Sequence, residues 1–157
     1  MADKPLPNDL AGILRQGRAI AYAMGARTLE AEHLLLALAD DADSPAARAL
    51  GAAGLDPDRI RALLRAERRQ SLAHAGVELV EDPVSSLEPG FTPRWGTSAK
   101  DALVRGKAAA GGGLHRETAA DLLVGVLGAE VGTVPRALAL AGIDRAELID
   151  GLVAGLR

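Results

Sequence analysis

The fold is decided by residues 32–56, which read EHLLLALADDADSPAARALGAAGLD. Shifted by 88 positions, the pattern returns without a gap as residues 120–144, ADLLVGVLGAEVGTVPRALALAGID. The shared positions combine bulky apolar residues with a Gly-x-Asp sequence, Gly54 to Asp56 in one stretch and Gly142 to Asp144 in the other. Chance similarity within an Ala- and Leu-rich chain can explain the matching apolar residues, but it does not explain why the Gly-x-Asp sequences match as well. We therefore interpret residues 10–72 and 97–156 as two copies of one structural unit.

Apolar residues in the first copy recur at the spacing of an α-helix. They are Leu10, Ile13, Leu14, Gly17 and Ala21, followed later by Ile60, Leu63 and Leu64. This period of three to four residues predicts an all-α protein.

Local signals mark where these helices begin and end. Ser44 and Asp56 each precede a proline, so each supplies a side-chain acceptor at an N-cap and is followed by a residue whose φ is preset for a helix. Asp144 is in the position to cap another helix. Gly54 and Gly142 stand just before these caps, where a preceding helix ends in the left-handed conformation that glycine adopts at little cost. The turns are therefore expected in matching pairs.

Composition excludes several classes of protein. The 157 residues carry 18 Lys and Arg against 21 Asp and Glu, a net charge of −3, which gives no electrostatic reason to expect a nucleic-acid partner. The absence of cysteine excludes disulfides, thiolate metal sites and cysteine nucleophiles. No apolar window is long enough to span a membrane, and the N-terminus lacks the layout of a secretory signal, so we expect a cytoplasmic protein. With aromatic residues at 2%, the core must be aliphatic.

Residues 73–93 read as a connection between the copies. This stretch includes Asp82-Pro83, Ser85-Ser86 and Pro89-Gly90, dipeptides typical of turns. We expect a single domain over residues 1–157, with repeat 1 at about 8–72, a linker at about 73–93 and repeat 2 at about 94–157.

No catalytic motif is present. The sequence lacks a nucleophile elbow, a paired-histidine zinc motif, a P-loop and a dinucleotide-binding glycine pattern. His33, His74 and His115 are the only candidate imidazole bases, and none has a second histidine at metal-ligand spacing. His33 lies in an apolar helix, where a hydrogen-bonded structural histidine is more common than a catalytic one. We therefore predict a non-enzymatic protein without a cofactor or metal.

A basic stripe runs along the helix predicted around residue 65. Arg61, Arg65 and Arg69 are spaced by four residues, with Arg68 beside them. Such a stripe is usually a solvated face, but it is also the face on which a regulatory or scaffold protein would hold an acidic partner. DNA binding by a short helical motif is a more distant alternative, because the charge balance is acidic.

Two of the three aromatic residues, Phe91 and Trp95, bracket Thr92-Pro93-Arg94 next to the linker. Rigid aromatic side chains at this seam could anchor a bound peptide, and we name Phe91, Thr92, Arg94 and Trp95 as candidate binding residues. The alternative is a linker pinned to the core by its two large side chains.

The motif at residues 32–38, with Gly54 and Asp56 after it, resembles the repeat of Clp ATPase N-terminal domains. The Phe-Thr-Pro-Arg phrase at residues 91–94 resembles the opening of the second repeat in ClpC-type unfoldases. The resemblance implies a double repeat of about four helices each, related by a pseudo-twofold axis. It also implies a receptor for substrates and adaptors, which in that family delivers captured chains to ClpP.

The resemblance implies one site residue in particular. In ClpC-type domains the glutamate matching Glu32 contributes, once per repeat, to a pocket for phosphorylated arginine, where a carboxylate pairs with the guanidinium. The second repeat has Ala120 in place of that glutamate and Asp121 in place of His33, so we expect one such site rather than two. Pairing of Glu32 within the fold is the alternative role.

Because the sequence ends at Arg157, we expect a stand-alone module without AAA+ motor domains. The predicted function is peptide or protein binding within the Clp proteolysis system. Three partner classes remain open: substrate chains, including arginine-phosphorylated ones; the Clp unfoldase or its adaptors; and cyclic-peptide natural products that target the unfoldase and would be sequestered by a decoy. We expect no nucleic-acid or membrane partner.

Overall fold

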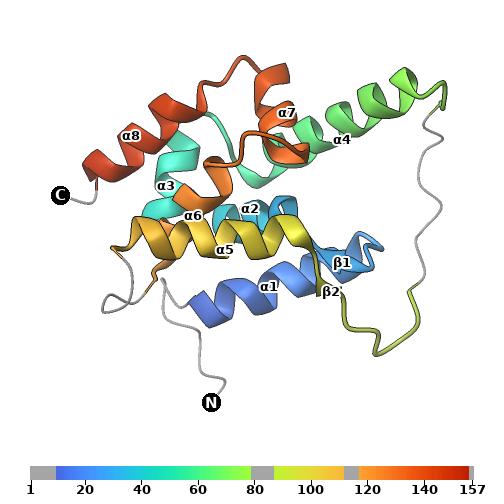
Figure 1. The fold of residues 1–157 in the computed structure, drawn as a ribbon, viewed down its shortest axis with the longest axis horizontal. Helices are drawn as coiled ribbons and strands as arrows, with labels where there is room; N and C mark the ends of the chain where they lie inside the picture. Colours follow the sequence, from blue (N-terminus) through green and yellow to red (C-terminus); the bar gives the residue numbers. More distant parts are fainter. Residues whose placement is uncertain (1–9, 79–86, 112–116, 156–157) are drawn as a thin grey trace.

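The computed structural model describes residues 10–78, 87–111 and 117–155, and in these ranges the protein is all-α, as predicted (Figure 1). The helices are α1 (Leu10–Ala23), α2 (Ala31–Asp40), α3 (Pro45–Ala52), α4 (Pro57–His74), α5 (Thr97–Ala109), α6 (Ala119–Leu127), α7 (Thr133–Leu140) and α8 (Arg145–Gly155). A two-residue parallel pair, β1 (Thr28–Leu29) with β2 (Arg94–Trp95), joins the turn after α1 to the segment before α5.

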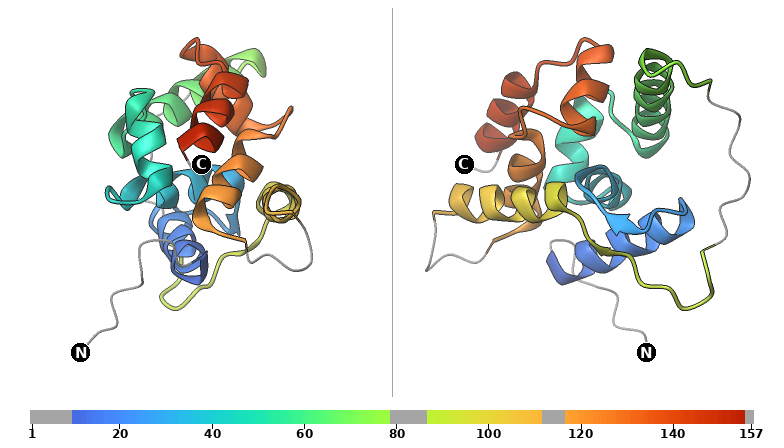
Figure 2. Two further views of the ribbon diagram at one scale, coloured as in Figure 1. Left: turned by 90° about the vertical axis from the view of Figure 1, so that its left-hand side faces the viewer. Right: turned by 45° about the vertical axis from the view of Figure 1, so that its right-hand side comes forward.

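The two halves of the chain have the same helix order and interlock. Helices α2, α3 and α4 begin at residues 31, 45 and 57, and α6, α7 and α8 begin 88 positions later, at 119, 133 and 145. The helices of the two halves also pack in matching ways. α1 lies on α2 as α5 lies on α6, and α4 packs on α7 as α8 packs on α3 (Figure 2). Each repeat therefore contributes its last helix to the other, and the pair forms one body with pseudo-twofold symmetry.

The predicted helix boundaries are confirmed. The Ser44 hydroxyl accepts a hydrogen bond from the Ala47 amide at 3.0 Å, and the Asp56 carboxylate accepts from the Arg59 amide at 2.7 Å. Before the last helix of each repeat, Gly54 and Gly142 adopt φ of 77° and 69°. Side chains other than glycine rarely adopt this conformation, so these two glycines set the angle between consecutive helices.

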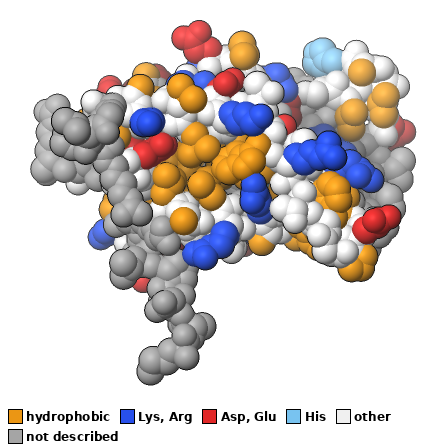
Figure 3. All heavy atoms as spheres, turned by 60° about the horizontal axis from the view of Figure 1, so that its bottom comes forward, with side chains coloured by type: hydrophobic (Ala, Val, Ile, Leu, Met, Phe, Trp, Pro, Cys, Tyr) orange, Lys and Arg blue, Asp and Glu red, His pale blue; other side chains and the backbone are white. Residues whose placement is uncertain are grey.

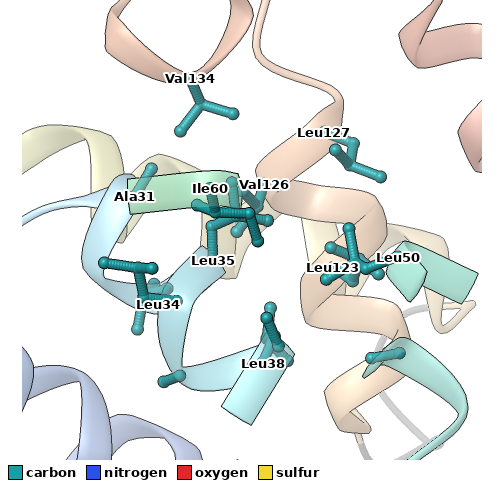
Figure 4. Close-up of a cluster of buried hydrophobic side chains, with 14 of the residues drawn as sticks. Ala31, Leu34, Leu35, Leu38, Leu50, Ile60, Leu123, Val126, Leu127 and Val134 are labelled. Carbon is teal, nitrogen blue, oxygen red and sulfur yellow. The ribbon is translucent and has the colours of Figure 1, made fainter. Parts of the chain in front are cut away.

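The core is aliphatic, as the scarcity of aromatic residues requires. Its centre is formed by α2 and α6, whose side chains are buried on nearly all sides (Figure 4). The cluster shown there draws Leu34, Leu35 and Leu38 from α2, Leu123, Val126 and Leu127 from α6, and single residues from α3, α4 and α7. Because side chains of both repeats fill one core, neither repeat buries its apolar surface alone.

The predicted linker begins two residues after the expected boundary, since α4 continues to His74. Residues 79–86 lie outside the described part of the chain. None of the described helices combines the length and the apolar character that crossing a membrane requires.

Candidate functional site

A cavity of about 520 Å³ opens between the two repeats. Its walls are the first turns of α2, α5 and α7 and the loop between α6 and α7. Its charged and hydroxyl-bearing lining residues include Glu30, Glu32, Ser98, Asp101, Arg105, Glu130 and Arg136. The cavity therefore combines side chains of both signs with three helix N-termini.

The first turn of α2 is held by His33, which is buried at 3% exposure. Its Nδ1 accepts a hydrogen bond from the backbone amide of Glu30 at 2.9 Å, which requires the neutral ring. Burial lowers the pKa of His33 to about 4, against the opposing effect of the Glu30 carboxylate. His33 is thus a helix-capping residue, and its position supports the structural interpretation.

Glu30 and Ser98 tie this turn to the second repeat. The Ser98 hydroxyl donates to the Glu30 carboxylate and accepts from the Ala31 amide at 2.9 Å, while the Ser98 amide donates to Glu30 at 3.2 Å. The Thr28 hydroxyl lies 3.0 Å from the other carboxylate oxygen of Glu30. Both oxygens of Glu30 are therefore occupied by contacts that set the width of the cavity.

Glu32 is the second residue of α2, two positions after Glu30, and it is partly buried in the cavity wall. Burial raises its pKa, and the negative charges of Glu30 and Glu67 add to the increase, while its own backbone amide and Arg136 oppose it. A cationic hydrogen-bond donor that entered the cavity would stabilise the charged form of such a poorly solvated carboxylate. Glu32 is thus a partly buried carboxylate in the cavity lining.

Two helices at the cavity follow a glycine and have no cap from their own N-cap residue, but the start of α5 is occupied by the Glu30 carboxylate, which accepts from the Ser98 amide. α5 follows Gly96 and α7 follows Gly132, and neither residue offers a side-chain acceptor. The first amide groups of a helix have no intrahelical partner and carry a partial positive charge, so they suit an anion. The cavity therefore brings the Glu32 carboxylate and the uncapped N-terminus of α7 into one lining.

Arg136 connects the cavity to a second hollow. Its Nε donates to the buried carboxylate of Glu67 at 2.8 Å, and the Ser71 hydroxyl donates to the same oxygen at 2.5 Å. The second hollow, about 600 Å³, lies between α4 and α7 and is also lined by Arg136. This pair holds α4 against α7 and keeps a guanidinium at the edge of the cavity.

The pseudo-equivalent position in the other half of the molecule lacks this chemistry. Ala120, which corresponds to Glu32, is buried and has no carboxylate. Asp121 and Thr118 cap each other at the start of α6, and Ser44 caps α3, so these helix ends are already satisfied. The second repeat therefore has no carboxylate at this position, and a single site at Glu32 stays a prediction.

The aromatic candidates lie elsewhere, on the first repeat. Phe91 and Trp95 are partly buried, with the guanidinium of Arg27 5.4 Å from the Phe91 ring centre and that of Arg18 5.2 Å from the Trp95 ring centre. Arg94 and Gly96 continue the attachment through amide hydrogen bonds to the carbonyls of residues 27 and 29. These contacts support a pinned linker, and peptide binding by Phe91, Thr92, Arg94 and Trp95 stays a prediction.

The face to which α1 contributes carries apolar side chains near its middle, with Lys and Arg around them (Figure 3). The partly buried apolar residues of α1, β2 and α5 are Leu10, Leu14, Trp95 and Leu103.

The basic stripe lies apart from the cavity. Arg61, Arg65 and Arg69 are exposed on α4 and do not line either hollow. In residues 10–78, 87–111 and 117–155, no three or more His, Asp or Glu side chains are grouped so that they could bind a metal ion. His74 is exposed on α4, and His115 lies outside these ranges.

Sequence reasoning singled out Glu32 but missed the residues around it. Ser98 and Arg136 come from the second repeat and reach Glu30 and Glu67, which are 68 and 69 positions away. Nothing local in the sequence signals such pairs. The missing side-chain caps at Gly96 and Gly132 were the one readable signal.

Comparison with known proteins supports the repeat. The family model of the Clp repeat (R) N-terminal domain matches residues 7–110, which is more than half of the chain. The match covers the first repeat and α5, while α6 to α8 follow from the internal repeat. No curated protein matches the sequence.

Proposed function

The chain belongs to the Clp repeat N-terminal domain family, whose members are substrate- or adaptor-binding modules of Clp ATPases, and from this we propose that it is a non-enzymatic receptor for protein segments in the Clp proteolysis system. The ligand group we propose is a phosphorylated arginine side chain, bound in the cavity between the repeats. It joins a cationic guanidinium to an anionic phosphoryl group, which is the combination of charges that the cavity walls complement.

The observation that carries this proposal is that Glu32 and the uncapped N-terminus of α7 line the same cavity. The carboxylate would accept two hydrogen bonds from the guanidinium part of the ligand. The phosphoryl oxygens would take the amides at the start of α7, which follows Gly132, because the start of α5 already has the Glu30 carboxylate as its partner. Arg136 would add positive charge on the phosphoryl side, because its Nε is held by Glu67 and its terminal nitrogens remain for a ligand.

The same geometry argues for capture rather than chemistry. The lining hydroxyl of Ser98 is engaged by the Glu30 carboxylate and the Ala31 amide, which is a structural arrangement and not that of a nucleophile paired with a base. Because the walls are preorganised by the contacts of His33, Glu30 and Ser98, little ordering entropy opposes binding of a short segment. We expect modest affinity, about micromolar or weaker, as suits a receptor that releases its cargo.

Titration calorimetry with free phosphoarginine tests the proposal. Glu32→Gln keeps the shape of the side chain and removes its charge, and we expect about a tenfold or larger loss of affinity. Glu147→Gln, an exposed change on α8, is the matched control and should leave affinity unchanged. Free arginine should bind more weakly than phosphoarginine, because it leaves the N-terminus of α7 unused.

Two results would contradict the proposal. Equal binding of phosphoarginine by the wild type and Glu32→Gln would remove the carboxylate from the site. Equal binding of arginine and phosphoarginine by the wild type would show that the N-terminus of α7 plays no part. Degradation or retention of a phosphorylated substrate by a Clp protease, with and without the protein, would then distinguish delivery from sequestration.

A further inference from the structure

α4 carries a concentration of positive charge that the fold does not use. Of its exposed residues, Arg61, Arg65, Arg68 and Arg69 lie within one third of the helix circumference, on the side away from the buried residues. In the described part of the chain only Arg61 has an ion pair among these four, with the exposed Asp58 at 3.6 Å. We call these four side chains the α4 arginine face.

The second repeat shows that folding does not require this face. α8 is the counterpart of α4, and it carries Ile149 and Val153 where α4 carries Arg61 and Arg65. Both helices pack in the same way, α4 on α7 and α8 on α3. Of the four arginines, only Arg69 has an arginine counterpart in the second copy, Arg157, so the complete stripe is a property of one copy and not of the repeat.

Packing leaves the α4 arginine face open. α4 contacts α7 and α2 through Ile60, Leu63, Leu64 and Glu67, on the opposite side of the helix. Figures 1 and 2 show α4 at the periphery of the molecule, with α7 along one side. Four like charges within about 12 Å repel one another, and opposite charges bound to this exposed surface would relieve that repulsion.

We propose that the α4 arginine face is a docking surface for an acidic protein segment, separate from the cavity that holds Glu32. Arginines spaced by four residues repeat about every 6 Å along the helix axis, which matches carboxylates spaced by four on a partner helix. A protein partner is favoured over a nucleic acid because the chain as a whole is acidic, at −3, and the surface is confined to a single helix.

A labelled helical peptide with glutamates at every fourth position is the probe, and its glutamine analogue is the control ligand. Fluorescence anisotropy at about 50 mM salt should detect binding of the glutamate peptide only, and affinity should fall at least about tenfold by about 300 mM salt. Arg65→Glu with Arg69→Glu should lower affinity by about tenfold or more at the lower salt. Arg48→Glu with Lys100→Glu makes the same change in net charge on exposed sites of α3 and α5 and should change affinity by less than about twofold.

The outcomes separate the alternatives. Equal loss in both double variants would show a general charge effect and overturn the proposal, as would absence of binding at low salt. Tighter binding of a double-stranded DNA oligonucleotide than of the peptide would reassign the face to nucleic acid. A dimer in sedimentation that dissociates only in the α4 variant would make a second copy of the chain the partner. Phosphoarginine binding should be unchanged in the α4 variant, so failure here leaves the cavity proposal intact.

Discussion

Replacing His33 with asparagine isolates the contact that shapes the first turn of α2. The neutral ring accepts the Glu30 amide, and a protonated ring cannot. Asparagine keeps an acceptor but does not titrate. The second repeat shows that a short side chain reaches the same group, because Asp121, the counterpart of His33, accepts from the Thr118 amide at 2.9 Å.

The magnitude follows from the pKa of His33. The ordinary value of 6.5 falls to about 4 in the folded protein, so the unfolded chain binds a proton that the native protein does not between these values. The contribution of His33 to the free energy of unfolding is therefore complete above pH 6.5 and decreases as the pH falls. We expect a loss of about 2 kcal/mol by about pH 5 and about 3 kcal/mol by about pH 4.

The measurement is the difference in unfolding free energy between the wild type and His33→Asn, from urea titrations across this pH range. Taking the difference cancels the contribution of carboxylates that titrate over the same pH range in both proteins, including Glu32 and Glu117. Asparagine also leaves a packing defect, which shifts the difference by a constant at every pH. A difference that stays flat from about pH 7 to about pH 4 would refute the assignment of His33 as a neutral acceptor.

Further substitutions probe other contacts. Glu117 has a buried, unpartnered Oε1 and a pKa raised to about 7 by burial and by the nearby carboxylate of Asp121. Glu117→Gln should therefore increase the free energy of unfolding by up to about 1 kcal/mol at about pH 8, after allowance for solvent screening, so the melting temperature should rise at about pH 8 but not at about pH 5. A Cβ on Gly125 would lie 2.0 Å from the Ala102 carbonyl, and we expect Gly125→Ala to destabilise the α5–α6 crossing by about 2 kcal/mol or more in chemical denaturation. Gly151→Ala on α8 meets no atom within 4 Å and should instead stabilise the protein by about 0.5–1 kcal/mol. Ser98→Ala removes the hydrogen bonds to the first turn of α2 and should cost about 1–3 kcal/mol of stability while weakening phosphoarginine binding, and unchanged binding would disconnect this contact from the cavity.

The asymmetry between the repeats is the feature that links fold to proposed function. In one copy the equivalent position is Glu32, which lines a cavity together with the uncapped N-terminus of α7, while in the other copy it is Ala120, and the N-termini of α6 and α3 are capped. Helix capping contributes about 1 kcal/mol to stability, so an uncapped end persists at a cost. In the proposed function, a ligand that takes the amides of α7 would offset this cost.

The site was within reach of sequence analysis only in part. Glu32 was named through resemblance to a family, since nothing in its local pattern distinguishes it from an ordinary helix-surface glutamate. Arg61, Arg65 and Arg69 were visible because a basic stripe is a local, periodic pattern. The sequence does not show that these arginines lie apart from the cavity, because their distance from it depends on where α4 packs.

The amino-acid sequence by itself determined the all-α class, the helix boundaries and the duplication. These depend on interactions within a few residues, such as helical periodicity, the caps at Ser44 and Asp56, and a glycine where φ is positive. Only the tertiary structure decided that the repeats exchange their last helices, that Ser98 meets Glu30, and that a cavity of mixed charge opens between them. Contacts between residues almost 70 positions apart leave no periodic trace, because what brings them together is the shared burial of apolar faces in one core.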